Sequence, residues 1–299
     1  MLNLKNQPHL HALLLLFIAM ISVQSSGSLA KVLFAQFPVL SVAAMRLLLS
    51  AVILAVIFKI WTIDFKAVKW KAIISYGIAL AGMNALFYLS NNRLPLGVAV
   101  SFEFIGPLSV ALFYARQKFD FVWVGLAIVG LILLFPFDQA SQSLDWIGVA
   151  FALGAGACWA LYIVAGQKPS GITGNHTVCL GMFIGMLCLM PIALFSGMSL
   201  NVFQPSNLGY FIALAILASA LPFSLEMIAL RNLTALSFGT LMSVEPAIAA
   251  LSGFIFLGEE LLWNQWLALA TIITASIGCT YTTQQAKKKP TLNEPNQPA

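Results

Sequence analysis

Apolar stretches of about 20 residues, the length that crosses roughly 30 Å of hydrocarbon as a helix, recur along nearly the whole chain. Charged residues make up only 8% of the 299 residues, against roughly 25% in an ordinary soluble domain. Because backbone groups in lipid must be satisfied within the protein, the pattern predicts an all-α polytopic membrane protein with ten transmembrane helices. The expected segments are 10–34, 40–58, 72–90, 96–114, 121–135, 146–164, 176–195, 208–230, 236–256 and 265–281.

The basic residues sort to one side of the expected membrane. Twelve of the 15 share a side with the N-terminus, namely Lys5, Lys59, Lys66, Lys69, Lys71, Arg116, Lys118, Lys168, Arg231, Lys287, Lys288 and Lys289. Lys31 and Arg93 fall on the other side, and Arg46 lies within the second segment. An excess of Lys and Arg marks the cytoplasmic side, so both termini are expected in the cytoplasm. The same sorting accounts for the net charge of +5 and excludes nucleic acid as a partner.

A weak internal repeat aligns Pro107 with Pro246, at an offset of 139 residues. Each half holds five expected helices, and an odd number makes the second half enter the membrane from the opposite side. The sequence therefore predicts two inverted five-helix repeats, the architecture of many secondary transporters, with a site between them near the bilayer midplane. The expected repeats are 10–135 and 146–281, followed by a cytoplasmic tail over 282–299.

Two carboxylates interrupt apolar segments close to mid-membrane depth. Glu103 and Glu245 each lie roughly 12 Å from a segment end at 1.5 Å per residue. A carboxylate at that depth costs several kcal/mol unless it is neutral, paired or facing water. Pro107 and Pro246 lie nearby, and each removes a helix hydrogen bond and frees a backbone carbonyl. Both segments are therefore expected in the protein interior, with Glu103 and Glu245 as functional candidates and structural pairing with Arg46 as the alternative.

The two repeats, each with a proline-containing helix near its end and with Phe256-Leu257-Gly258-Glu259 after the second, resemble the EamA family of the drug/metabolite transporter superfamily. Four longer runs, 83–90, 152–160, 226–230 and 238–246, resemble amino-acid exporters of that family in Gram-negative bacteria. The resemblance implies export of small amino acids of the threonine and homoserine kind across the bacterial inner membrane, in exchange for protons. It supplies no set of binding residues, and the first half has no Leu-Gly-Glu after its proline-containing helix.

An amino-acid substrate brings one carboxylate and one ammonium, and the chain offers a group for each. Arg46 can hold a carboxylate with its planar fork, and Glu103 or Glu245 can hold the ammonium. Glu226 is a further candidate, with an ion pair to Arg231 as its structural alternative. Other polar and aromatic candidates on these segments are Gln24, Ser25, Asn84, Ser101, Ser243, Tyr88, Trp159 and Tyr162. Hydrogen bonding or packing between helices is the other interpretation of these residues.

One carboxylate is enough to couple export to protons. Such a group takes a proton when the site opens outward and gives it up when the site opens inward, where it accepts the ammonium of a new amino acid. Competition between proton and substrate makes the exchange obligatory, so an inward proton gradient drives export. Pro246 interrupts the helix beside Glu245, which favours Glu245 over Glu103 for this role.

Two other classes of function stay open at the level of sequence. A membrane-embedded enzyme is the more distant one, because His9, His11 and His176 fall near segment ends without a His-Glu-x-x-His motif or an acidic cluster for a metal. An exporter of drugs or other metabolites with the same fold is the nearer rival. No cofactor is expected. The oligomeric state, a homodimer included, is not determined by the sequence.

Overall fold

The computed structural model describes residues 8–94, 96–134, 145–248, 251 and 262–288, and all regular structure within them is helical. The helices are α1 (Pro8–Phe34), α2 (Val39–Ile57), α3 (Trp70–Asn91), α4 (Leu96–Glu103), α5 (Ile105–Tyr114), α6 (Lys118–Leu134), α8 (Trp146–Gly166), α9 (Gly174–Phe195), α10 (Pro205–Ala215), α11 (Leu221–Asn232), α12 (Ala235–Met242) and α14 (Trp263–Lys288). Short 3₁₀ turns, η2 (Ile60–Thr62) and η3 (Leu200–Phe203), precede α3 and α10. A π-helical turn, η4 (Ile216–Ala220), joins α10 to α11. With α4–α5 and α10–α11 each taken as one segment, the described residues form ten helical segments, which confirms the expected all-helical architecture.

Two of the ten segments are interrupted at equivalent places. Phe104 forms the turn between α4 and α5, and Ser243 forms the turn between α12 and the helical residues 244–248. Each turn lies three residues before a proline, Pro107 or Pro246, and the two turns are separated by the repeat offset of 139 residues. Because a proline cannot donate to the carbonyl four residues earlier, both interruptions follow directly from the sequence.

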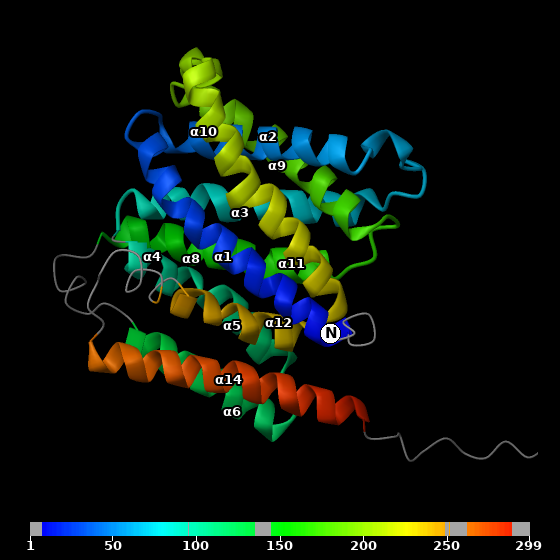
Figure 1. Ribbon diagram of the computed structural model, residues 1–299, viewed down its shortest axis with the longest axis vertical. Coiled ribbons are helices and arrows are strands. Elements are labelled where there is room, and N and C mark those ends of the chain that lie inside the picture. The colour runs from blue at the N-terminus through cyan, green and yellow to red at the C-terminus, as the bar shows by residue number, and fades with distance from the viewer. Residues whose placement is uncertain (1–7, 95, 135–144, 249–250, 252–261, 289–299) are drawn as a thin grey trace, which may run out of the picture.

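The helices stack in layers of roughly aligned rods (Figure 1). α2 and α9 pack together on one side of the molecule, and α6 and α14 pack together on the opposite side. Between these pairs, α3 packs against α8 and α9, α1 packs against α11, and α5 packs against α8 and α12. Helices from the first half of the chain therefore contact helices from the second half through the whole depth of the molecule.

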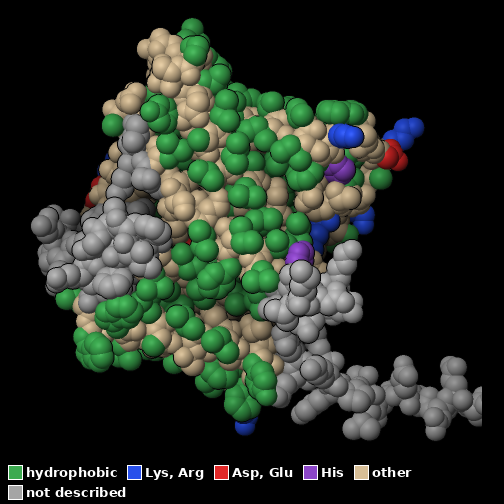
Figure 2. Space-filling model, in the orientation of Figure 1, with side chains coloured by type: hydrophobic (Ala, Val, Ile, Leu, Met, Phe, Trp, Pro, Cys, Tyr) green, Lys and Arg blue, Asp and Glu red, His purple; other side chains and the backbone are tan. Residues whose placement is uncertain are grey.

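The surface is that of a multi-pass membrane protein. The helices α2, α3, α8 and α9 and the unit Pro205–Asn232 are long and apolar enough to cross a membrane, and shorter apolar helices cover His11–Ser26, Ala99–Tyr114 and Ala235–Ile248. Figure 2 shows a face covered by hydrophobic side chains, with Lys, Arg and His side chains gathered mainly toward one end. The start of α1, the end of α14 and the loop between α2 and α3 lie at that same end (Figure 1).

Three glycines allow α5 to touch α8 and α12 backbone to backbone. A Cβ at Gly106 would lie 2.0 Å from the carbonyl oxygen of Gly156, and a Cβ at Gly239 would lie 2.4 Å from that of Pro107. A Cβ at Gly156 would lie 2.5 Å from the carbonyl oxygen of Glu103, the group that Pro107 deprives of its helix partner. The freed carbonyl therefore points at the glycine backbone of α8, where a weak Cα–H···O contact takes the place of the missing bond.

Gly156 is the residue of α8 at this crossing. Its neighbours on the helix lie elsewhere, because Ala157 is exposed and a Cβ at Gly154 would meet only a Leu86 methyl at 3.1 Å. On α9, Gly181 allows a similar close approach, since a Cβ there would lie 2.3 Å from the ring of Tyr76.

The π-helical turn η4 also has its backbone satisfied from neighbouring helices. Ser22 on α1 donates its hydroxyl to the carbonyl of Leu217 at 2.7 Å, and Ser50 on α2 donates to the carbonyl of Ala215 at 2.9 Å. Pro222 follows one turn later, and such a residue frees a carbonyl in the turn before it. The interruption expected near Pro222 is thus a π turn held on two sides by serines.

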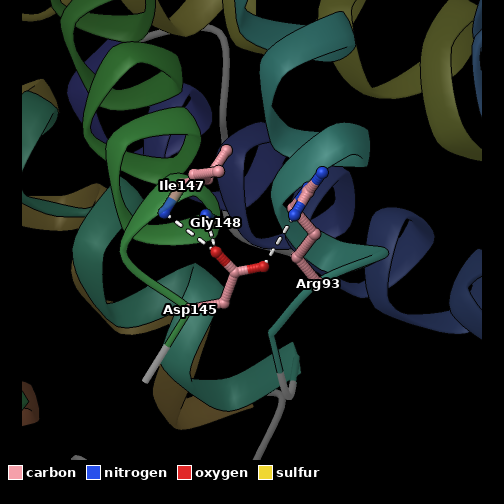
Figure 3. Close-up of polar contacts among 4 residues, drawn as sticks. All are labelled: Arg93, Asp145, Ile147 and Gly148. Atoms are coloured by element: carbon pink, nitrogen blue, oxygen red, sulfur yellow. Dashed lines mark hydrogen bonds and ion pairs between the residues drawn. The ribbon is translucent and has the colours of Figure 1, made fainter. Parts of the chain in front are cut away.

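The loop after α3 is tied to the start of α8 (Figure 3). Arg93 Nη1 lies 2.8 Å from Asp145 Oδ2, the one ion pair in the part of the chain that the structure describes. The other carboxylate oxygen caps α8 by accepting from the backbone N–H groups of Ile147 and Gly148, at 2.9 and 3.2 Å. The hydrogen bond from Arg93, with help from these two N–H groups, lowers the pKa of the Asp145 carboxyl. This contact fixes where the second half of the chain begins relative to the first.

The glycine contact generates a stability prediction. In Gly106→Ala the new methyl group would overlap the backbone oxygen of Gly156, which cannot rotate away, so we expect a loss of about 1–3 kcal/mol in stability. Thermal unfolding of the purified protein in detergent measures it. Gly125→Ala on α6 is the control, because nothing lies within 4 Å of its Cβ position. Equal unfolding temperatures for the two variants would contradict the close packing of α5 on α8.

Candidate functional site

The main polar site is built at the two helix interruptions. Glu103 is the last residue of α4 and is 7% exposed, while Glu245 lies two residues after the Ser243 turn. Neither carboxylate has a hydrogen bond or an ion pair within the described residues, and α12, which precedes Glu245, packs against α5, which follows Glu103. Two carboxylates in an apolar interior disfavour each other's charged form. The pair is therefore suited to binding a proton or a cationic group.

Glu226 on α11 extends this group of carboxylates. It is 5% exposed, and the hydroxyl of Tyr162 on α8 donates to its Oε2 at 3.1 Å. Tyr162 is itself fully buried, with its ring centroid 5.0 Å from that of Tyr76 and 5.8 Å from that of Phe223. The helix of Glu226 contacts α12, the helix that precedes Glu245, and α12 contacts α5, the helix that follows Glu103. The structure thus brings together the elements that carry three of the predicted site residues.

The structural alternative for Glu226, an ion pair with Arg231, is not formed. Arg231 Nη2 donates to the hydroxyls of Ser170 at 2.8 Å and Thr177 at 2.9 Å, and Nη1 donates to the carbonyl of Ile172 at 3.2 Å. Residues five apart on a helix are about 140° apart around its axis, so the guanidinium and the carboxylate leave α11 on different sides. Arg231 ties the end of α11 to the α8–α9 connection.

Arg46 belongs to a second polar cluster, between α2 and α3. It is 6% exposed, its Nη2 donates to Asn84 Oδ1, and its Cζ lies 4.8 Å from the centroid of the Tyr88 ring, within the range of a cation–π interaction. Asn84 donates in turn to the carbonyl of Leu80 at 2.7 Å. The structural alternative, pairing of Arg46 with Glu103, is not formed. The guanidinium is buried without a carboxylate partner among the described residues.

Gln24 and Ser243 are less directly engaged. Gln24 is half-buried on α1, which packs against α11 and η4, and its side chain makes no hydrogen bond within the described residues. Ser243 is fully buried, and its hydroxyl donates to the carbonyl of Thr240 at 2.6 Å. Ser276 on α14 donates to the same carbonyl at 3.4 Å. The Ser243 hydroxyl therefore serves as a hydrogen-bond donor to the backbone at the turn. A substrate contact by either Gln24 or Ser243 stays a prediction.

The buried donors that lack a partner within the described residues include the Nε–H of Arg46 and the Nε1–H of Trp159. Trp159 lies edge-on to Phe104, with ring centroids 4.9 Å apart, beside the interruption that carries Glu103. Buried donors normally find an acceptor, and a carboxylate or hydroxyl oxygen is the type of group that these two would hold. The residues that the structure describes contain no cluster of three or more His, Cys, Asp or Glu side chains able to hold a metal.

Comparison with known proteins identifies the class of the protein. The model of the EamA-like transporter family matches residues 146–281. The chain is 48% identical over 287 residues to the threonine/homoserine exporter RhtA of Escherichia coli (strain K12), with 96% of this chain and 97% of that protein covered. It is 49% identical over 271 residues to the protein of the same name from Salmonella typhimurium (strain LT2), with 90% and 91% covered. The chain belongs to the EamA-like transporter family. Membership in a family of transporters excludes the enzyme that the sequence left open.

One solved structure shares the fold of this EamA-like transporter. It is a crystal structure that superposes with a TM-score of 0.73 at 17% sequence identity, over 91% of this chain and 98% of that one. A more distant relative is the uncharacterized transporter YwfM of Bacillus subtilis (strain 168), 27% identical over 248 residues, with 78% of this chain and 81% of that protein covered. Neither carries information on the substrate.

Within this EamA-like transporter, sequence reasoning underrated two aromatic residues. Tyr162 and Tyr88 were expected only as aromatic residues on lining helices, yet one binds Glu226 and the other holds the guanidinium of Arg46. The spacing contained a usable signal for the second, because Asn84 and Tyr88 are four residues apart and so share a helix face. No such signal marked Tyr162, since its partner lies 64 residues away.

Proposed function

We propose that this protein exports small hydroxylated amino acids, threonine and homoserine, from the cytoplasm in exchange for protons. The observation that carries the proposal is the identity of 48% over 96% of the chain to a threonine/homoserine exporter. The interior chemistry supports it, because an amino acid needs an anionic and a cationic partner, and the protein holds the buried carboxylates of Glu103 and Glu226, the partly buried carboxylate of Glu245 and the buried guanidinium of Arg46. Its location is then the bacterial inner membrane.

The proposal includes the architecture of two inverted five-helix repeats with both termini in the cytoplasm. Three observations support it. The helix interruptions at Phe104 and Ser243 are separated by the repeat offset, and α2 packs against α9, α5 against α12 and α6 against α14. Basic side chains also gather toward one end of the molecule (Figure 2). The members of each pair belong to equivalent segments of the two halves, with α5 and α12 on opposite sides of the two proline-linked turns. A two-fold axis in the membrane plane would relate them, and substrate sites in such proteins lie near that axis.

Proton coupling is assigned to Glu245, with Glu103 as its neighbour. The carboxylate takes a proton from outside and releases it inside, where the ammonium of a new substrate replaces it. Glu245 is the better candidate, because it is more exposed than Glu103 and Pro246 interrupts the helix beside it. The rival function, export of drugs or other metabolites, has no comparable support from a relative, and the transport assay below tests it.

Reconstituted protein provides the test of this function. Proteoliposomes should transport homoserine and threonine in one direction when a pH gradient is imposed in the other. Glu245→Gln mimics the protonated carboxylate, so we expect gradient-driven transport to fall by about 10²-fold or more while the protein stays folded. Asp64→Asn, in the exposed α2–α3 loop, is the control for loss of a carboxylate. Transport of an unrelated dye without transport of either amino acid would replace this function with the rival one.

Arg46 provides a second prediction, on recognition of the substrate carboxylate. Arg46→Lys keeps the positive charge but loses the planar fork, so we expect the Km for homoserine to rise by about tenfold, the effect of about 1.4 kcal/mol of lost binding. Arg93→Lys, on the exposed ion pair with Asp145, is the matched control. Normal kinetics in both Arg46→Lys and Arg46→Gln would leave Arg46 with a packing role only.

The orientation can be checked with reporter fusions. Fusions after Gln36 and Gln142 should report the periplasm, and fusions after Lys66 and at Lys289 should report the cytoplasm, because the basic residues gather on the cytoplasmic side. A periplasmic signal at Lys289 would refute both the count of ten crossings and the inverted repeat.

A further inference from the structure

Glu226 occupies a position that the simple one-carboxylate mechanism does not use. It lies six residues before the end of α11, roughly 9 Å along the helix axis at 1.5 Å per residue. In the proposed orientation that end of α11 is cytoplasmic. The helix α11 also contacts α12, the helix that leads to Glu245, so Glu226 is placed to connect Glu245 with the side of the membrane to which antiport must deliver the proton.

The carboxylate of Glu226 is held by a donor that packing fixes in place. The hydroxyl of Tyr162 donates to Oε2 at 3.1 Å, and the Tyr162 ring is fixed between Tyr76 and Phe223. A phenol at this position orients one carboxylate oxygen and leaves the other free to bind a proton. A purely structural carboxylate in an apolar interior would more often have a cationic partner, and here Arg231 is directed elsewhere.

Among the side chains that the structure describes, no other titratable group competes for Glu226. The remaining groups on the helices packed against α11 face other partners or are exposed. On α9, His176 contacts Thr173 and the carbonyl of Phe58, and Cys179 contacts the carbonyl of Ala51. On α8, Cys158 faces the position of Gly82, and on α1 the side chain of His11 is exposed. Within this part of the chain, the titratable groups beside Glu226 are thus Tyr162 and, beyond it, Tyr76.

The path from Glu226 to the end of α11 is closed in this structure. Arg231 bonds to Ser170, Thr177 and the Ile172 carbonyl, which ties α11 to the α8–α9 connection. Gln167 at the end of α8 donates to the carbonyl of Leu233 at 3.4 Å. A Cβ at Gly166 would lie 2.5 Å from Leu230, so α8 and α11 are in close contact at this level. Release of a proton from Glu226 in this direction requires α11 and α8 to separate.

We propose that Glu226 is a second proton-binding residue of the transport cycle, which receives the proton from Glu245 and releases it to the cytoplasm. The inference rests on the proposed function. In the step, the protonated carboxyl of Glu245 gives its proton, through water, to the carboxylate of Glu226, and Glu245 becomes free to hold the substrate ammonium. Separation of α11 from α8 then exposes Glu226, and its proton passes to cytoplasmic water. Tyr162 is a positioning residue that orients the accepting carboxylate.

The test compares two transport modes in proteoliposomes that contain the full-length protein. Homoserine transport driven by a pH gradient requires proton release, whereas homoserine counterflow at equal pH on both sides does not. For Glu226→Gln we expect the gradient-driven rate to fall by at least about tenfold and counterflow by less than about threefold. Glu226→Asp keeps an ionisable group and should restore at least part of the response to the gradient. Tyr162→Phe should shift the dependence of the rate on internal pH, because the carboxylate loses its hydrogen bond.

Ser224→Ala is the control on the same helix, because the Ser224 hydroxyl bonds only to the carbonyl of Ala220 in its own helix. A gradient response in Glu226→Gln within about twofold of the control overturns the role of Glu226 while the proposed function stands. Equal losses of both transport modes in Glu226→Gln and in Glu226→Asp also overturn it, because that pattern means a structural role. Failure of the wild-type protein to transport homoserine refutes the proposed function itself, and wild-type transport that ignores the gradient refutes both proton roles.

Discussion

Every interrupted helix in a hydrocarbon environment must find hydrogen-bond partners inside the protein, and this requirement organises the whole structure. The described residues contain three such interruptions, at Phe104, at Ser243 and at η4. At Phe104 a glycine of α8 lies against the backbone. At Ser243 two serine hydroxyls, one from the same segment and one from α14, donate to a backbone carbonyl. At η4 serines of α1 and α2 donate to backbone carbonyls. The helices that supply these partners are thereby fixed around the interruptions.

The same requirement explains why the ionisable groups are in the centre. Carboxylates are expensive in lipid, and they are tolerated at the interruptions because these places already face protein on every side. The result is a separation of charge, with the carboxylates along α4, α11 and the residues after α12, and the guanidinium of Arg46 between α2 and α3. No described ion pair neutralises one with the other, since Arg46 interacts with Asn84 and Tyr88 instead.

The sequence was sufficient where a local rule decides the outcome. The ten segments follow from the length of the apolar stretches, and both helix interruptions follow from Pro107 and Pro246, because proline acts on its own helix. Side-chain direction is a tertiary property and was not predictable in the same way. Their proximity in sequence left a pair between Arg231 and Glu226 open as an alternative, but the guanidinium has three oxygen acceptors near the α8–α9 connection.

The π turn η4 has a consequence for the face that α11 presents. A π turn accommodates one residue more than the α-helical turn it replaces, so each side chain after it is rotated by about 100° relative to an uninterrupted continuation of α10. Glu226 comes after this turn, and it meets Tyr162 in the register that the extra residue creates. The serines of α1 and α2 that hold η4 thus also set the angular position of a carboxylate on the following helix. In an evolutionary comparison, loss of one residue between 216 and 220 would be expected to occur together with loss of the acidic residue at 226.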